Sequence, residues 1–352
     1  MSGDRLPGNR EALDAIAALT GRSGSDITDE FPSECAGGDR TRADPADVEQ
    51  VLRSLINRVR NAPALPWDRK AGLQDTLTAM MTDPPDCSNA EVDAWRRLVR
   101  HHPQEIRTLD RSPVVLPVMD EPQEAAWHAL MDFDLDLDET WVLVGGQMTM
   151  IHCLEHGVDG YRATDDGDIV LGVWTRRDAL STAARLLLDR DFVAVDTADG
   201  FGYRYARGTT VMDLLLPEGL ERQRHQPRAA GGRPGLPVEG GNQALIRAER
   251  LPVRLGGRTG HVLRPSLLGA LVSKSAALVA DSRDPDRHRD DIALLGQVAY
   301  QSGMRELRDQ ATPHDRRRLR KALATMPDSH PSWRRIQNPV EVRDGLSRLS
   351  PV

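Results

Sequence analysis

The chain has 352 residues, of which 39% are hydrophobic and 28% are charged, and its formal net charge is −7 at pH 7. A chain of this length has room for about two domains with ordinary hydrophobic cores. The acidic balance excludes a uniformly basic nucleic-acid binder, although a local basic patch is compatible with it. We expect no membrane span or signal peptide, and three scattered cysteines favour a cytoplasmic protein.

The first hundred residues predict two parts. Residues 1–43 are rich in Gly, Ser, Asp and Arg and have little periodicity, so we expect a disordered or loosely attached arm. Residues 44–105 predict a small helical module. Pro45 begins one of its helices, and Ser88 and Glu91 form a capping box before another. Nothing in this module indicates a function.

Asp166, Gly167 and Asp168 begin an apolar strand with two carboxylates that are two residues apart. Because side chains alternate across a strand, both carboxylates lie on the same face. Two anions held so closely repel each other unless a divalent cation lies between them, and Mg²⁺ or Mn²⁺ prefers carboxylate oxygens. The pair therefore predicts half of a metal site.

A glycine pair precedes these carboxylates. The β-rich run 140–144 ends at Gly145 and Gly146, and a helical pattern follows from Gln147. Glycines at a strand-to-helix turn let backbone amides approach a ligand, and the start of a helix favours anions. We therefore expect a phosphate-binding turn. Arg162 either binds phosphate as well or only fixes the loop before the strand.

A third carboxylate lies further along the chain. Residues 201–206 and 209–216 predict a β-hairpin joined at Arg207 and Gly208, and Asp213 interrupts its apolar second strand. An ionised carboxylate in a buried strand is costly without a partner. If this strand lies beside the strand of Asp166, Asp213 completes a three-carboxylate cluster that binds metal and deprotonates a hydroxyl.

Lys274 is one of only three lysines in the chain and lies in a predicted helix over residues 266–280. Its spacing from Leu267 and Leu271 points the ammonium toward the packed side, where it needs an anionic partner. The alternative is a lysine whose stem covers apolar surface while its ammonium reaches water. Asp291 also lies on the packed side of its helix, or else is an exposed residue near the helix start.

The order GlyGly, RATDDGD and VMDLLLP resembles the nucleotidyltransferase superfamily, and within it the AbiEii-type toxin nucleotidyltransferases. The likeness spans about residues 122–300. It implies an α+β fold: a nucleotidyltransferase-like mixed-sheet core over residues 106–263, an N-terminal helical extension, and a C-terminal helical domain over residues 264–352. Gly167 differs from the family, which usually has an apolar residue between the paired aspartates.

The resemblance implies that three carboxylates bind Mg²⁺ or Mn²⁺: Asp166, Asp168 and Asp213. It implies that five further residues bind the nucleotide or assist the transfer: Gly145, Gly146, Arg162, Lys274 and Asp291. The implied activity moves a nucleoside monophosphate from an NTP to an acceptor hydroxyl, such as an RNA (tRNA) end. The implied context is a toxin-antitoxin or phage-defence system with a cognate antitoxin or other partner protein.

Two alternatives concern the acceptor and the activity itself. A late basic run predicts either a track for an RNA phosphate backbone or a solvated helix face: Arg316, Arg317, Arg318, Arg320 and Lys321. The acceptor could equally be a protein side chain or a small antibiotic.

The rival function is a catalytically degenerate module that keeps the nucleotidyltransferase fold and binds RNA or a partner protein. Gly167 and the unexplained N-terminal region favour this rival.

Overall fold

The computed structural model describes residues 7–20, 24–35, 38–61, 65–100, 106–137, 140–162, 164–173, 178–220, 227–229 and 231–350. The chain divides into two compact units. Unit one comprises residues 1–105, 173–177 and 219–226, and unit two comprises residues 106–172, 178–218 and 227–352.

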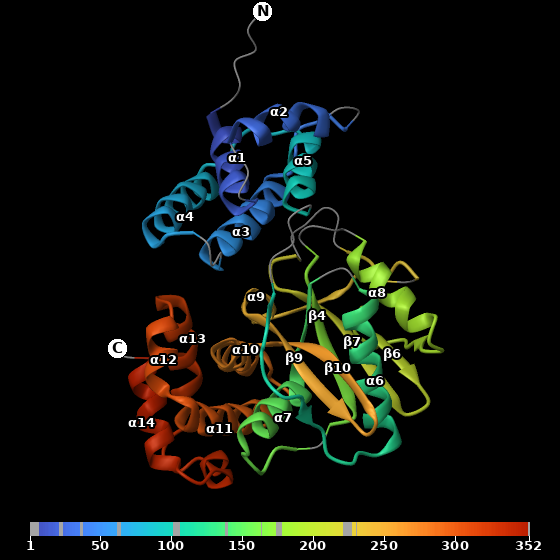
Figure 1. Ribbon diagram of the computed structural model, residues 1–352, viewed down its shortest axis with the longest axis vertical. Coiled ribbons are helices and arrows are strands. Elements are labelled where there is room, and N and C mark those ends of the chain that lie inside the picture. Colours follow the sequence, from blue (N-terminus) through green and yellow to red (C-terminus); the bar gives the residue numbers. More distant parts are fainter. Residues whose placement is uncertain are drawn as a thin grey trace, which may run out of the picture. The chain divides into compact units, whose positions relative to one another are not determined.

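Unit one is helical (Figure 1). Its helices are α1 (Pro7–Thr20), α2 (Gly24–Glu34), α3 (Pro45–Asn61), α4 (Trp67–Thr82) and α5 (Asn89–Arg100). Their apolar faces form one core that includes the fully buried Ile16, Leu52 and Trp95. The predicted capping box is confirmed, because the Ser88 backbone amide donates to Glu91 and the Glu91 amide donates back to the Ser88 hydroxyl.

The expected disordered arm is wrong over the described part of residues 1–43. Helices α1 and α2 occupy most of it, and Ile16 and Ile27 are completely buried in the core that α3 and α5 share. The polar clusters between the helices hid an apolar face formed by Ala12, Ile16 and their neighbours. Burial of that face against other helices stabilises two segments whose local propensity is weak.

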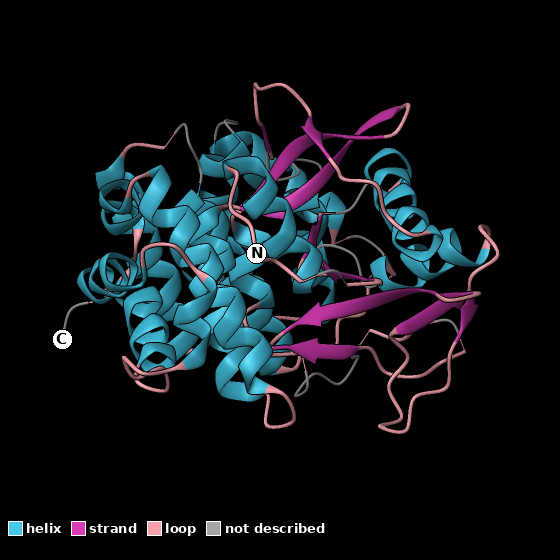
Figure 2. Ribbon diagram, turned by 90° about the horizontal axis from the view of Figure 1, so that it is seen from below, coloured by secondary structure: helices cyan, strands magenta, loops and turns pink. Residues whose placement is uncertain are grey.

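Unit two contains two β-sheets (Figure 2). The larger has the order β3-β4-β7-β6-β5, and β8 also pairs with β7. Its strands are β3 (Trp141–Leu143), β4 (Asp166–Leu171), β5 (Val193–Ala194), β6 (Arg204–Arg207), β7 (Thr210–Pro217) and β8 (Leu236–Val238). In the smaller sheet, β9 (Ala248–Leu255) and β10 (Arg258–Pro265) form a hairpin, and β1 (Arg107–Thr108) and β2 (Val114–Val115) pair with β9.

The helices of unit two pack on these sheets and continue to the end of the described chain. They are α6 (Glu121–Asp136), α7 (Gly145–His156), α8 (Ala179–Leu188), α9 (Gly241–Ile246), α10 (Leu267–Ala280), α11 (Pro285–Ser302), α12 (Met304–Gln310), α13 (Pro313–Leu323), η1 (Pro331–Arg335) and α14 (Pro339–Leu349). Mixed pairing in the larger sheet, with helices before and after it, confirms the predicted α+β class. Within the described ranges, every helix is too short or too polar to cross a bilayer.

Strands β4 and β7 separate two chemically different environments. Helix α6 packs on one face, where an ideal Cβ on Gly167 would lie 2.5 Å from the Met212 sulfur and 3.8 Å from Ala126 of α6. Asp166 and Asp168 lie on the opposite face, together with Val170, which α9 covers. Gly167 therefore makes room for a packed methionine and does not line the carboxylate face.

The packing around Gly167 can be tested by adding one methyl group. Gly167→Ala should lower the free energy of unfolding by about 1–3 kcal/mol, because the new Cβ overlaps the Met212 side chain. Gly257→Ala is the matched control, since nothing lies within 4 Å of an ideal Cβ there. Urea denaturation measures both, and equal stability of the two variants would contradict this account of Gly167.

Candidate active site

The pairing of β4 with β7 brings the three predicted carboxylates to one face. The two strands are parallel, and the register aligns Asp168 with Asp213. Residues aligned on neighbouring strands point the same way, so Asp213 joins Asp166 and Asp168. The condition that the sequence left open, that the strand of Asp213 lies beside the strand of Asp166, is met. We call the surface formed by Asp166, Asp168 and Asp213 the carboxylate face.

Arg204 is a member of this face that sequence reasoning missed. It lies opposite Asp213 in the antiparallel pair of β6 and β7. Its Nε and Nη2 donate to the two carboxylate oxygens of Asp213, at 2.9 and 2.7 Å. The pair raises the pKa of the Arg204 guanidinium, which stays charged. At Asp213 the effect of burial is larger than that of Arg204, so the pKa of the carboxyl is raised.

The hairpin carried a signal for Arg204. We expected Arg207 and Gly208 at the turn, but β6 ends at Arg207 and β7 begins at Thr210, with Arg207 and Thr210 aligned. The turn therefore lies one residue later than expected, and this moves the residue opposite Asp213 by two positions. Had the turn been placed correctly, the register alone would have aligned Arg204 with Asp213.

Asp168 has a different environment from its neighbours. Burial, together with the negative charges of Asp213 and Asp166, raises the pKa of its carboxyl to about 7. The positive charge of Lys274 lowers the pKa of the Asp168 carboxyl. Within the described ranges, no residue forms a hydrogen bond or ion pair with this carboxylate.

The predicted glycine pair forms the first turn of α7 and packs tightly against its neighbours. Gly145 has φ +70°, and an ideal Cβ there would lie 2.0 Å from the Asp168 Oδ2. An ideal Cβ on Gly146 would lie 2.8 Å from Thr164 and 3.1 Å from the Arg162 Nη2. Only glycine at 145 allows the start of the helix to approach Asp168 this closely. Phosphate binding at this turn stays a prediction.

Lys274 and Asp291 form a buried ion pair on α10 and α11. The Lys274 Nζ lies 2.5 Å from the Asp291 Oδ2, and the two side chains are 5% and 1% exposed. Lys274 therefore has an anionic partner, as its packed position requires, but this partner is Asp291 and not the expected nucleotide phosphate or aspartate of the carboxylate face. The alternatives of a lysine that reaches water and of an exposed Asp291 are wrong. Arg162 reaches the same carboxylate at 4.0 Å. The structure thus collects three of the predicted residues in a second charged group.

The donor set of the carboxylate face suits Mg²⁺ or Mn²⁺, which bind carboxylate oxygens. Asp166 is 44% exposed, and the half-buried Asp168 carboxylate lacks a partner among described residues. In this arrangement, however, the described part of the chain holds no group of three His, Cys, Asp or Glu side chains close enough to bind one ion. The Asp213 carboxylate is instead bound by Arg204. The three carboxylates are thus of the right chemical type for a divalent cation and lie on one face of the sheet, but Arg204 occupies Asp213.

Three arginines of the late basic run donate hydrogen bonds to other parts of unit two. Arg316 donates to the backbone carbonyls of Ala311 and Arg308, Arg318 donates to Glu218, and Arg320 donates to the Ser350 carbonyl. Within this run, Arg317, Arg320 and Lys321 are exposed. Helix α13 thus uses several arginines to attach itself to its neighbours and keeps three basic side chains at its surface. RNA binding itself stays a prediction.

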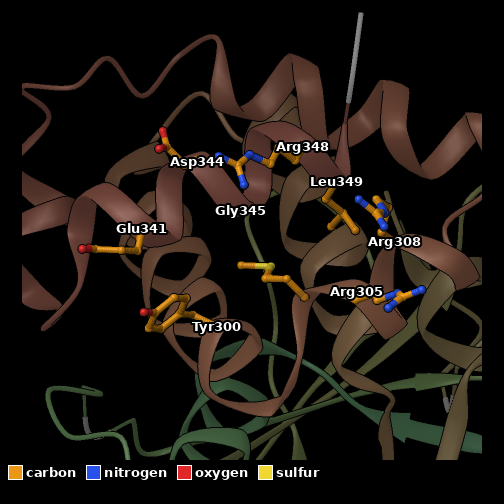
Figure 3. A pocket seen from close by; sticks show the side chains of 9 residues that line it. Tyr300, Arg305, Arg308, Glu341, Asp344, Gly345, Arg348 and Leu349 are labelled. Carbon is orange, nitrogen blue, oxygen red and sulfur yellow. The ribbon is translucent and has the colours of Figure 1, made fainter.

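A separate cleft of about 480 Å³ lies between α11, α12 and α14 (Figure 3). Arg305 and Arg308 lie on one side, Glu341 lies on the other, and Tyr300 and Leu349 add apolar surface. None of the predicted site residues lines this cleft.

Comparisons with known proteins leave the family open. No protein-family model matches the chain, and no curated protein matches it. Among solved structures, the chain is similar to the antibiotic-resistance factor ANT(2'')-Ia, an aminoglycoside nucleotidyltransferase. The two are 15% identical, the match covers 59% of this chain and 97% of that chain, and the TM-score is 0.35. At this distance the match supports no conclusion about activity, which must be argued from the site itself.

The buried ion pair predicts strong coupling between its members. Lys274→Met should lower the free energy of unfolding by roughly 3–5 kcal/mol, because it leaves the buried Asp291 carboxylate with only the partly exposed Arg162, 4.0 Å away. Asp291→Asn should also destabilise, and the double variant should lose clearly less than the sum of the two. Urea denaturation of all four proteins completes the cycle, and additive losses would show that the two charges do not interact.

His288 makes the stability of unit two dependent on pH. Burial, together with the positive charge of Lys274, lowers the pKa of this imidazole to about 4. The imidazole therefore binds a proton more readily in the unfolded chain than in the folded protein. The contribution of neutral His288 to the free energy of unfolding is complete above pH 6.5 and is lost as the pH falls toward 4.

His288→Gln should remove about 2 kcal/mol of the stability difference between pH 7 and pH 5. Urea denaturation of the wild type and the variant at both pH values measures the effect. His152, whose pKa burial also lowers well below its usual value, keeps a residual slope in both proteins. An unchanged slope in the variant would contradict a neutral, buried His288.

Proposed function

We propose that the protein is a nucleotidyltransferase that moves a nucleoside monophosphate from an NTP to an acceptor hydroxyl. One observation carries the proposal: Asp166, Asp168 and Asp213 share one face of two adjacent strands, with Asp168 against the start of α7. An inert scaffold gains no stability from such a cluster, because three neighbouring anions repel one another.

The chemistry assigns a role to each group. The three aspartates would hold Mg²⁺ or Mn²⁺, which when bound neutralises the charge of the triphosphate. The acceptor oxygen forms a bond to the α-phosphorus, the bond from that phosphorus to the bridging oxygen breaks, and pyrophosphate leaves. The acceptor's proton passes to one of the carboxylates. Backbone amides at Gly145 and Gly146 and the nearby cation of Arg162 would orient the phosphates.

In this scheme Lys274 acts on the carboxylate face through its charge and does not contact the nucleotide. Its ammonium is bound to Asp291, yet its charge still stabilises the ionised form of Asp168. We therefore assign Lys274 and Asp291 to the electrostatic support of the carboxylate face. Direct contact between Lys274 and a phosphate would require the pair with Asp291 to open.

The finer features of the proposal concern the acceptor and the setting. An RNA (tRNA) end and a toxin-antitoxin context follow from the resemblance to AbiEii-type toxins, and a protein or a small molecule is the other acceptor class. The degenerate binding module loses one of its supports, since Gly167 packs against Met212 on the opposite face. Incubation with each labelled NTP, Mg²⁺ and an extract of RNA, protein or small molecules identifies the acceptor.

Metal and nucleotide binding test the proposal without knowledge of the acceptor. Mn²⁺ should raise the melting temperature of the wild type, and a non-hydrolysable nucleotide should raise it further, because both bind only the folded state. The double variant Asp166→Asn with Asp168→Asn should lose both increments. Its metal-free stability should be preserved or raised, because the substitutions remove repulsion and keep the volume.

The control for this experiment is Asp165→Asn. Asp165 precedes the strand and accepts a hydrogen bond from Gln123, which asparagine can also accept. This variant should keep both melting-temperature increments. If the wild type responds neither to millimolar Mn²⁺ nor to the nucleotide, the transferase proposal fails and the non-catalytic binding module replaces it.

A further inference from the structure

Arg204 binds Asp213, the carboxylate that β7 contributes to the carboxylate face. Its bidentate bond occupies both oxygens of Asp213, and the Asp213 side chain is only 7% exposed. A charge-assisted fork of this kind fixes both partners in direction as well as in distance. Asp213 is therefore already bound by a cation in the metal-free protein.

The same guanidinium also approaches a second carboxylate. Its Nη2 lies 3.9 Å from the Asp166 Oδ2, while it bonds Asp213 at 2.7 Å. Arg204 thus lies between two of the three carboxylates to which the proposed function assigns a divalent cation. Within the described residues, the third carboxylate, Asp168, has no partner.

The surroundings of Arg204 allow it to leave. Its side chain is 37% exposed, and its guanidinium lies 5.7 Å from the centre of the Tyr203 ring. It also lines a cavity of about 230 Å³, together with Asp196 and Arg233, which pair with each other at 2.7 Å. A partly exposed arginine beside open space can move without disturbing the hydrophobic core.

We propose that Arg204 is a positioning residue that takes the place of the divalent cation on the carboxylate face. It aligns Asp213 and neutralises its charge in the metal-free protein, and it releases Asp213 when a divalent cation binds. The inference rests on the proposed function, because it assumes that Asp213 is a metal ligand. Its consequence is competition: the affinity for metal is lowered by the strength of the pair between Arg204 and Asp213.

Titration of the full chain with Mn²⁺ by isothermal calorimetry tests this competition. Arg204→Gln should bind Mn²⁺ at least about tenfold more tightly than the wild type, because the competing cation is gone. Arg204→Lys keeps a charge but loses the fork, and its affinity should lie between the two. Arg207→Gln is the matched control on the same hairpin, since Arg207 donates to the Arg190 carbonyl and packs on Phe192.

Asp213→Asn shows whether the gain passes through this carboxylate. In the wild-type background it should change the Mn²⁺ affinity little, because the metal loses one ligand but no longer has to displace Arg204 from it. In the Arg204→Gln background it should remove most of the gain. A structural role for Arg204 alone would lower stability and leave this coupling absent.

The outcomes separate the two proposals. If Mn²⁺ binds and the affinity is the same with arginine, lysine or glutamine at position 204, the competition is overturned and the transferase proposal stands. If Mn²⁺ binds to none of the variants, the proposed metal-dependent function fails first. Should Arg204→Gln not fold, the comparison of Arg204→Lys with the wild type decides, and equal affinities overturn the inference.

Discussion

The candidate site depends on one constraint, the parallel register of β4 on β7. That register places Asp168 beside Asp213 and, through the alternation of side chains, Asp166 on the same face. Three carboxylates in a partly buried space repel one another, and burial adds a cost for each charge. The rest of the unit can be understood as the arrangement that makes this concentration of negative charge tolerable.

Two ion pairs on either side of the face supply the compensation. Arg204 neutralises Asp213 from the neighbouring strand β6, and Lys274 contributes positive charge from α10 although it is bonded to Asp291. Asp168 lies between them, and its carboxyl has a pKa raised to about 7. An added divalent cation would relieve the repulsion that the two pairs leave behind.

The helical parts show how charged residues can be used for assembly instead of recognition. Arg318 attaches α13 to Glu218, which lies just beyond β7, and Arg247 bonds the completely buried Asp315 near the start of α13. These bonds tie the C-terminal helices to the sheet region that carries Asp213. Charged side chains of this region therefore hold α13 against the rest of unit two.

The sequence by itself determined the features that depend on local periodicity. Alternation placed Asp166 and Asp168 on one face, helical spacing placed Lys274 and Asp291 on packed faces, and the Ser88 capping box marked a helix start. These predictions needed only a period of two or of 3.6 residues and a preference for caps. The α+β class was expected from the resemblance to the nucleotidyltransferase superfamily.

The tertiary structure alone decided which of these groups meet. The pairing of Lys274 with Asp291 joins residues on different helices, and the bond from Arg204 to Asp213 depends on a turn position that shifts the register by two residues. The helices at the N-terminus form because their small apolar faces are buried by α3 and α5. Partners across space, strand register and burial between helices are long-range properties, and local sequence patterns do not contain them.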